Sequence, residues 1–175
     1  MDEPTRIAKN HPVRRVFCNL ADRALTQSSV ADKDLLLYLS ELLVDFIYIK
    51  RLYRLKDKRG RRIEYLSDMF LQAEGVPSKE RKGYYKYIGD YSLFILGMFP
   101  ENLRYGRRIL SHDDYANAGR RSYLAASELE FNTQGTLVFR KLAAKFEHCV
   151  LSLNWVRQYT HNPFYQYMFR QFGIT

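Results

Sequence analysis

A dense cluster of positive charge is the feature of this sequence best suited to binding chemistry. Positions 50–62 hold eight basic residues and a single acid, Asp57, so this segment carries +7 of the chain's formal charge of +9. Clustered Lys and Arg side chains neutralise phosphates and release counterions, which gives salt-dependent binding to nucleic acid. Tyr53 lies within this segment and Tyr65 just after it, and both are placed to stack on exposed bases. The candidate nucleic-acid-binding residues are Lys50, Arg51, Arg54, Lys56, Lys58, Arg59, Arg61 and Arg62.

The alternative for the same segment is a solvated loop whose charge keeps the protein soluble. No helix-turn-helix or other recognisable reading head accompanies the basic residues, so any contact with nucleic acid is expected to be mostly with its backbone. Arg104, Arg107 and Arg108 add a second, smaller group of cations that we expect to assist.

A single carboxylate, Asp90, lies in a run of residues that favour burial. A buried carboxylate must be paired, hydrogen-bonded or neutral, and such groups are enriched at functional sites. If Asp90 is functional, we expect Tyr87, Tyr91 and Ser92 to surround it in a pocket for a small ligand. The alternative is a structural Asp that is satisfied by an Arg or lies at the solvent edge of its helix.

The C-terminal part of the chain is rich in aromatic residues, which are enriched in protein interfaces. These residues are expected to pack within the chain, against a second copy in a homodimer, or against a ligand. The stretch from Ala116 to Ala126 is lined by small residues, which allow two helices to approach closely, and it is a second candidate dimer surface. The aromatic group, with one Met, comprises Trp155, Tyr159, Phe164, Tyr165, Tyr167, Met168, Phe169 and Phe172.

Familiar catalytic motifs are missing from the sequence. It has no nucleophile elbow of the G-x-S-x-G type, no phosphate-binding Walker A loop, and no strand before its glycines as a dinucleotide fingerprint requires. The Glu-x-x-His pairs of di-iron bundles are absent as well. We therefore predict no metal site and no cofactor, and we favour a protein that is not an enzyme. The glycines at 83, 89 and 97 are interpreted as close-packing positions.

The two cysteines, Cys18 and Cys149, lie far apart among apolar neighbours, so we expect buried free thiols in a reducing compartment. The first residues are polar and contain acids, and no apolar run is long enough to span a bilayer. These features together predict a cytoplasmic protein that does not bind a membrane.

The apolar periodicity predicts an all-α fold, because residues recur at steps of three and four through most of the chain. We expect one compact bundle of about six or seven helices in a single domain spanning residues 1–175, with residues 1–11 as a flexible arm. Residues 54–62 are expected to form a basic loop, or a very short hairpin. The expected helices cover about 12–28, 30–53, 63–74, 78–99, 111–131, 136–160 and 164–171, and the second is expected to be capped by Ser29 with Asp32 three residues on.

These observations favour a non-enzymatic helical binding or regulatory domain that contacts an anionic macromolecule, nucleic acid, through the basic segment. One alternative is a protein-interaction module that acts as a homodimer. Another is a small-ligand-binding or enzymatic pocket around Asp90, since pockets between the helices of a bundle are common binding sites.

Overall fold

The computed structural model describes residues 7–103 and 110–174, and within these ranges it is all-α, as the sequence predicts. Its only β pairing in the described chain is an isolated bridge between Lys56 and Arg62. None of the described helices is long and apolar enough to cross a bilayer. The elements in order are α1 (Pro12–Gln27), α2 (Lys33–Asp45), α3 (Ile49–Leu52), α4 (Leu66–Gly75), α5 (Ser78–Met98), the 3₁₀ turn η1 (Pro100–Leu103), α6 (His112–Glu128), α7 (Thr133–Ala144), α8 (Phe146–Thr160) and α9 (Pro163–Gln171).

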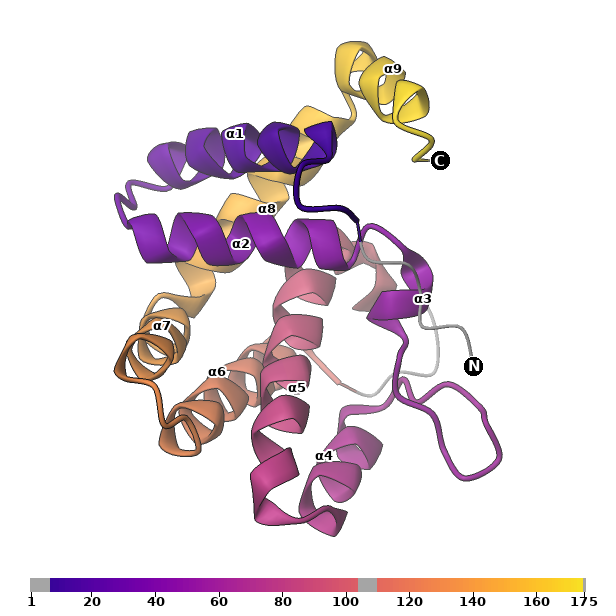
Figure 1. Cartoon of the computed structure of the whole chain (residues 1–175), viewed down its shortest axis with the longest axis vertical. Coiled ribbons are helices and arrows are strands. Elements are labelled where there is room, and N and C mark those ends of the chain that lie inside the picture. Colours follow the sequence, from indigo (N-terminus) through magenta and orange to yellow (C-terminus); the bar gives the residue numbers. More distant parts are fainter. Residues whose placement is uncertain (1–6, 104–109, 175) are drawn as a thin grey trace.

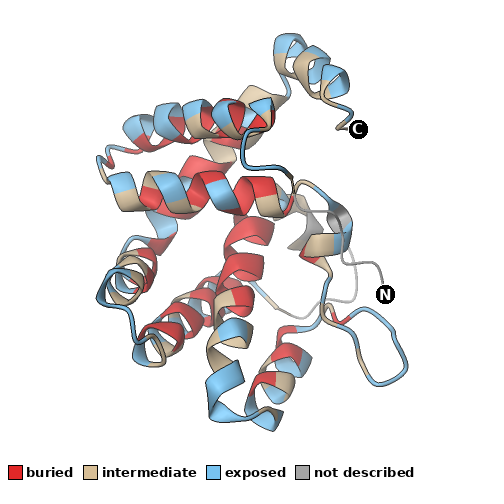
Figure 2. Cartoon of the chain, viewed as in Figure 1, coloured by how far each residue is buried: buried red, intermediate tan, exposed pale blue. Residues whose placement is uncertain are grey.

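Helix α5 runs through the middle of the molecule and packs against α4, α6 and α8 (Figure 1). The pair α1 and α2 crosses one end of α5, and α1 also packs on α8. Every residue of α5 from Tyr87 to Gly97 is buried, whereas its first two turns are mostly exposed (Figure 2). The C-terminal half of α5 is therefore the centre of the apolar core.

Polar side chains at the helix starts explain several of the boundaries. Asp32 accepts hydrogen bonds from the backbone N–H groups of Asp34 and Leu35 at the start of α2. Ser111 and Asp114 form a reciprocal capping box at the start of α6. The predicted helices at 78–99 and 164–171 are confirmed to within one or two residues by α5 and α9.

Two of the expected long helices are interrupted. The predicted helix 30–53 begins later than expected, at Lys33, and divides into α2 and α3 around a bend at Phe46–Tyr48. The predicted helix 136–160 begins earlier than expected, at Thr133, and divides into α7 and α8 at Lys145. Lys145 adopts φ −103° and ψ 20°, outside the helical region, and caps α7 through its N–H to the carbonyl of Lys141. The structure therefore has more, shorter helices than the expected six or seven.

Two glycines of α5 are close-packing positions, as expected. A Cβ atom at Gly89 would lie 2.8 Å from the ring of Tyr123, and one at Gly97 would lie 2.3 Å from Leu153. Gly83 does not fit this interpretation, because a Cβ atom there would meet nothing within 4 Å. The close contacts of α5 with α6 and α8 therefore require glycine, which has no side chain, at positions 89 and 97. Gly83, at the exposed start of α5, has no such requirement.

The expected arm at residues 1–11 falls partly outside the described residues, which begin at Ile7. In the described part, the Arg14 guanidinium donates hydrogen bonds of 2.9 Å to the carbonyls of Ile7 and Ala8. The same side chain forms an ion pair with Glu41 of α2. Residues 7–11 are thus held against the start of α1.

Candidate nucleic-acid interface

Residues 54–62 form a tight hairpin turn that projects from the helices beside α3 and α4 (Figure 1). The N–H of Asp57 donates to the carbonyl of Arg61 at 2.9 Å, and the N–H of Ile63 donates to that of Leu55 at 3.0 Å. Gly60 has φ 77°, in the left-handed region where a side chain is strained. The alternative expected for this segment, a very short hairpin, is the one that the structure has. We call residues 54–62 the basic hairpin.

Asp57, the one acid of the segment, organises this turn. Its carboxylate accepts hydrogen bonds from the backbone N–H groups of Arg59 and Arg61 and from the Arg61 side chain. These bonds, the backbone bond from Arg61 above all, hold the pKa of Asp57 below its usual value. Because the Asp57 carboxylate also accepts two backbone hydrogen bonds, it forms an ion pair with only one of the neighbouring described cations, Arg61.

Three other basic residues of the segment are engaged by the protein itself. Arg51 forms an ion pair with Asp45 at 2.9 Å. The guanidinium of Arg54 lies 4.4 Å from the centre of the Tyr87 ring, and that of Arg62 lies 5.6 Å from the Tyr53 ring. Such cation–π contacts hold the base of the hairpin against α5 and against Tyr53, the residue that follows α3.

Four basic side chains remain exposed without an ion-pair partner among the described residues. They are Lys50, Lys56, Lys58 and Arg59. The backbone beneath one of them is fixed, since Gln72 of α4 donates a hydrogen bond to the carbonyl of Lys56 at 2.9 Å. The hairpin thus presents free cations on a positioned backbone.

A groove of about 450 Å³ lies between the basic hairpin and α4. Arg61 and Arg62 contribute cations to it, and Tyr65 contributes an aromatic ring that is 58% exposed. Tyr53, the other candidate stacking residue, is covered by Arg62 and makes an edge contact with Tyr91. Of the two tyrosines, Tyr65 is therefore the one open to a ligand. The lining is completed by Asp57, Ile63, Asp68, Leu71 and Gln72.

Asp90 is buried, as expected, but its partners come from other positions than predicted. The hydroxyls of Tyr38 and Tyr123 donate to its Oδ1 at 2.6 and 2.8 Å, and the Lys86 ammonium donates to its Oδ2 at 2.5 Å. Burial first, and then the Asp90 charge, raise the pKa values of both tyrosines well above 10. The carboxylate is fully partnered, which is the arrangement expected of a structural Asp. Only Lys86, one helical turn before Asp90, was accessible to sequence reasoning.

The three expected neighbours of Asp90 have other surroundings. Tyr87 donates its hydroxyl to the carbonyl of Leu52 at 2.6 Å and lines a smaller cleft of about 240 Å³ beside Arg54. Tyr91 lies with its hydroxyl 3.5 Å from the carbonyl of Glu64. The buried Ser92 hydroxyl has no hydrogen-bond partner among the described residues. Among the described residues, Asp90 thus accepts hydrogen bonds from Tyr38, Lys86 and Tyr123 in place of the expected neighbours, although the pKa of Tyr87 is raised by burial above all and, in smaller part, by the Asp90 charge.

The candidate dimer surfaces are mostly used within the chain. The small-residue face of α6 is buried, and a Cβ atom at Gly119 would lie 2.4 Å from the ring of Phe146 in α8. In α9, Phe169 stacks on Phe17 of α1 with ring centres 5.5 Å apart. No residue of α9 is buried: Phe164 and Tyr167, each 62% exposed, are the most exposed members of the aromatic group, and the others are half-buried.

The remaining predictions concern the two cysteines, metal binding and the second group of cations. Cys149 is buried and free, whereas Cys18 is free but only half-buried. The described residues contain no group of three His, Cys, Asp or Glu side chains suited to a metal ion. Arg104, Arg107 and Arg108 lie outside the described residues.

Comparison with known proteins adds no relative to this picture: no protein-family model matches the chain, and neither a curated protein nor a solved structure gives a significant match. The basic hairpin, its free cations and the adjoining groove are therefore the observations from which a function can be inferred.

Proposed function

We propose that this chain is a non-enzymatic helical module that binds single-stranded nucleic acid through the basic hairpin. The observation that carries the proposal is the set of four unpaired cations at Lys50, Lys56, Lys58 and Arg59, on and beside a projecting turn. Exposed cations without protein partners can exchange their counterions for phosphates, and each such exchange favours binding at low salt.

The groove beside the hairpin supports a single strand over a duplex. Tyr65 offers an exposed ring, and Arg61 and Arg62 line the same groove. An unpaired base can stack on such a ring while its phosphates contact the cations, whereas the bases of a duplex are already stacked on one another. The groove also contains Asp57 and Asp68, which repel phosphates, so the strand's backbone is expected to follow the hairpin itself.

The first test is a salt titration of binding to fluorescent single-stranded DNA and RNA, followed by anisotropy. The variant Lys56→Gln/Lys58→Gln/Arg59→Gln removes three of the four free cations. For single strands, each phosphate contact contributes about −0.7 to the slope of log K against log salt. Loss of three contacts should therefore make the slope shallower by about 2. Equal slopes for the variant and the wild type would contradict the proposal, as would no binding at low salt.

A matched control removes the same charge elsewhere. Lys33, Arg121 and Arg140 are exposed on α2, α6 and α7 and have no ion-pair partner among the described residues. Their triple Gln variant should keep the wild-type slope. If both triple variants weaken binding equally, net charge and not the hairpin is responsible.

The role of Tyr65 is tested by Tyr65→Ala, which should weaken single-strand binding by about 1–3 kcal/mol and leave duplex binding nearly unchanged. Tyr167→Ala is the control, because Tyr167 is similarly exposed but lies on α9. A loss of equal size on single strands and duplexes would remove the stacking part of the proposal and leave the electrostatic part in place.

A further inference from the structure

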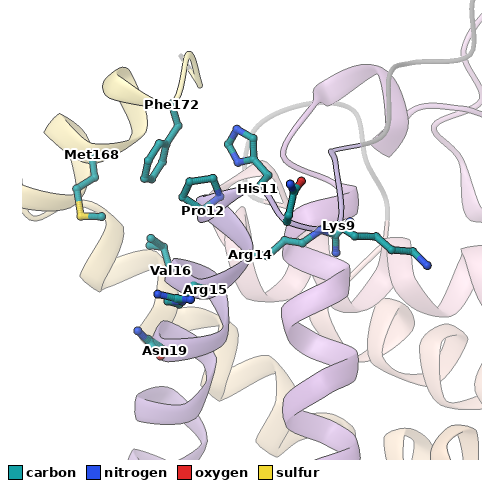
Figure 3. A pocket seen from close by; sticks show the side chains of 10 residues that line it. Lys9, His11, Pro12, Arg14, Arg15, Val16, Asn19, Met168 and Phe172 are labelled. Carbon is teal, nitrogen blue, oxygen red and sulfur yellow. The ribbon is translucent and has the colours of Figure 1, made fainter.

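A third concave surface lies between the start of α1 and the C-terminal helix α9 (Figure 3). Its volume of about 490 Å³ falls within the roughly 300–1,000 Å³ typical of small-ligand clefts. Among the described residues, no Asp or Glu lines it. The lining residues are Lys9, Asn10, His11, Pro12, Arg14, Arg15, Val16, Asn19, Met168 and Phe172.

One side of the cleft is apolar. Met168 and Phe172 project from α9 toward the first turns of α1, where Pro12 and Val16 lie opposite them (Figure 3). The ring of Phe172 is held in place by an edge contact with His11, with ring centres 5.8 Å apart. A flexible thioether next to a fixed ring adapts well to an aliphatic chain.

The other side of the cleft is basic, but its cations are not equivalent. Arg14 is already engaged by Glu41 and by two backbone carbonyls. Lys9 extends away from α9 (Figure 3). Arg15 is exposed on α1 and has no partner among the described residues, and Asn19 follows it one helical turn later. One free guanidinium with an amide beside it suits a single anionic head group.

We propose that this cleft binds an amphipathic monoanion, an aliphatic carboxylate, with its chain against Met168 and Phe172 and its carboxylate on Arg15. The planar guanidinium matches a carboxylate in a two-pronged hydrogen bond, and none of the described lining residues is an acid. Glu41, which lies beside the lining, is paired with Arg14. A ligand with several phosphates fits less well, because among the described lining cations Arg14 is paired and Lys9 extends away from α9, which leaves Arg15 for the head group.

Decanoate and decan-1-ol are the probes that test the inference, since they share a chain and differ in the charge of the head group. Calorimetric titration below the micelle concentration should show saturable binding of decanoate, with decan-1-ol about ten- to a hundredfold weaker, as expected for the loss of a charged hydrogen bond. Arg15→Gln should weaken decanoate by a similar factor and leave decan-1-ol unchanged. Arg15 is exposed, so the variant should fold normally.

Two further variants locate the site. Arg140→Gln removes the same charge from α7, outside the cleft, and should leave decanoate binding as in the wild type. Met168→Glu puts an acid against the bound chain and should abolish binding. The inference is overturned if decanoate and decan-1-ol bind equally, if Arg15→Gln and Arg140→Gln behave alike, if Met168→Glu still binds, or if no saturable binding is seen.

Discussion

Asp90 joins three helices through one side chain. Its carboxylate on α5 accepts hydrogen bonds from Tyr38 of α2 and Tyr123 of α6, and Lys86 closes the cluster from the same helix. A buried carboxylate without such partners would cost several kcal/mol, so the tyrosine hydroxyls are what make its burial tolerable. The directional hydrogen bonds of the cluster fix how α2 and α6 are oriented relative to α5. Apolar contacts alone, which are not directional, specify this orientation less precisely.

The substitution Asp90→Asn should destabilise the protein by about 1–3 kcal/mol, because the new amide keeps the two tyrosine contacts but buries N–H donors next to the Lys86 ammonium. Lys86 is partly exposed and can turn to solvent, which limits the loss. The free energy of unfolding is measured by urea titration. Asp22→Asn, at an exposed position on α1, should change it by less than about 0.5 kcal/mol. Similar values for the two variants would show that the cluster adds no stability.

The partners of Asp90 also show how far sequence reasoning reaches at this scale. The spacing of Lys86 and Asp90 is the one that pairs side chains on a helix, so this contact can be predicted. Tyr38 and Tyr123 stand 52 and 33 residues from Asp90. Nothing in their local sequence distinguishes them from the other tyrosines. Their role follows only from how α2 and α6 cross α5.

The packing of α5 against its neighbours depends on glycine. Gly97→Ala should destabilise the protein by about 1–3 kcal/mol, although Ala is the better helix former by about 1 kcal/mol, because the new methyl would overlap Leu153 of α8. Gly83→Ala is the matched control on the same helix. Its site is exposed and open, so it should stabilise the protein by about 0.5–1 kcal/mol. Urea unfolding of both variants checks this, and a shift of equal sign would contradict the close-packing interpretation.

Helix interiors were predicted better than helix interruptions. The start of α6 follows from the capping side chain of Ser111, which is a local signal. The cap expected at Ser29 for the second helix is wrong, because Asp32 caps α2 and Ser29 adopts a left-handed φ of 56°. The bend at Phe46–Tyr48 and the break at Lys145 carry neither Gly nor Pro. Apolar residues keep their helical spacing across both interruptions, so the periodicity predicts one continuous helix at each place. The α1–α9 cleft was missed for a related reason: its two sides are distant in sequence, and neither side alone looks like a site.

The whole molecule is built around buried tyrosines, and this should make it sensitive to alkali. Burial raises the pKa values of Tyr38, Tyr87 and Tyr123, and it raises the pKa of Cys149 to about 12. In the unfolded chain these groups ionise near 8.5–10. Groups with a raised pKa in the folded state stabilise the fold fully below the unfolded pKa and less as pH rises above it.

The free energy of unfolding should therefore fall between about pH 9 and pH 11, by up to about 1.4 kcal/mol per pH unit for each such group. Urea midpoints measured across this range test the expectation. Tyr87→Phe should make the decline less steep, and Tyr65→Phe, at an exposed tyrosine, is the matched control that should leave the decline unchanged. A flat profile up to pH 11 would contradict it.

The packing of α1 on α8 has a consequence for synthesis on the ribosome. The apolar face of α1, with Val13, Phe17 and Leu20, is covered in part by a helix that begins only at Phe146. Because the ribosome synthesises the chain from its N-terminus, α8 does not exist to cover this face until most of the sequence has been translated. The central pair α5 and α6 is complete much earlier. We therefore expect the nascent chain to form this centre first and to expose α1 to chaperones until α8 has left the exit tunnel.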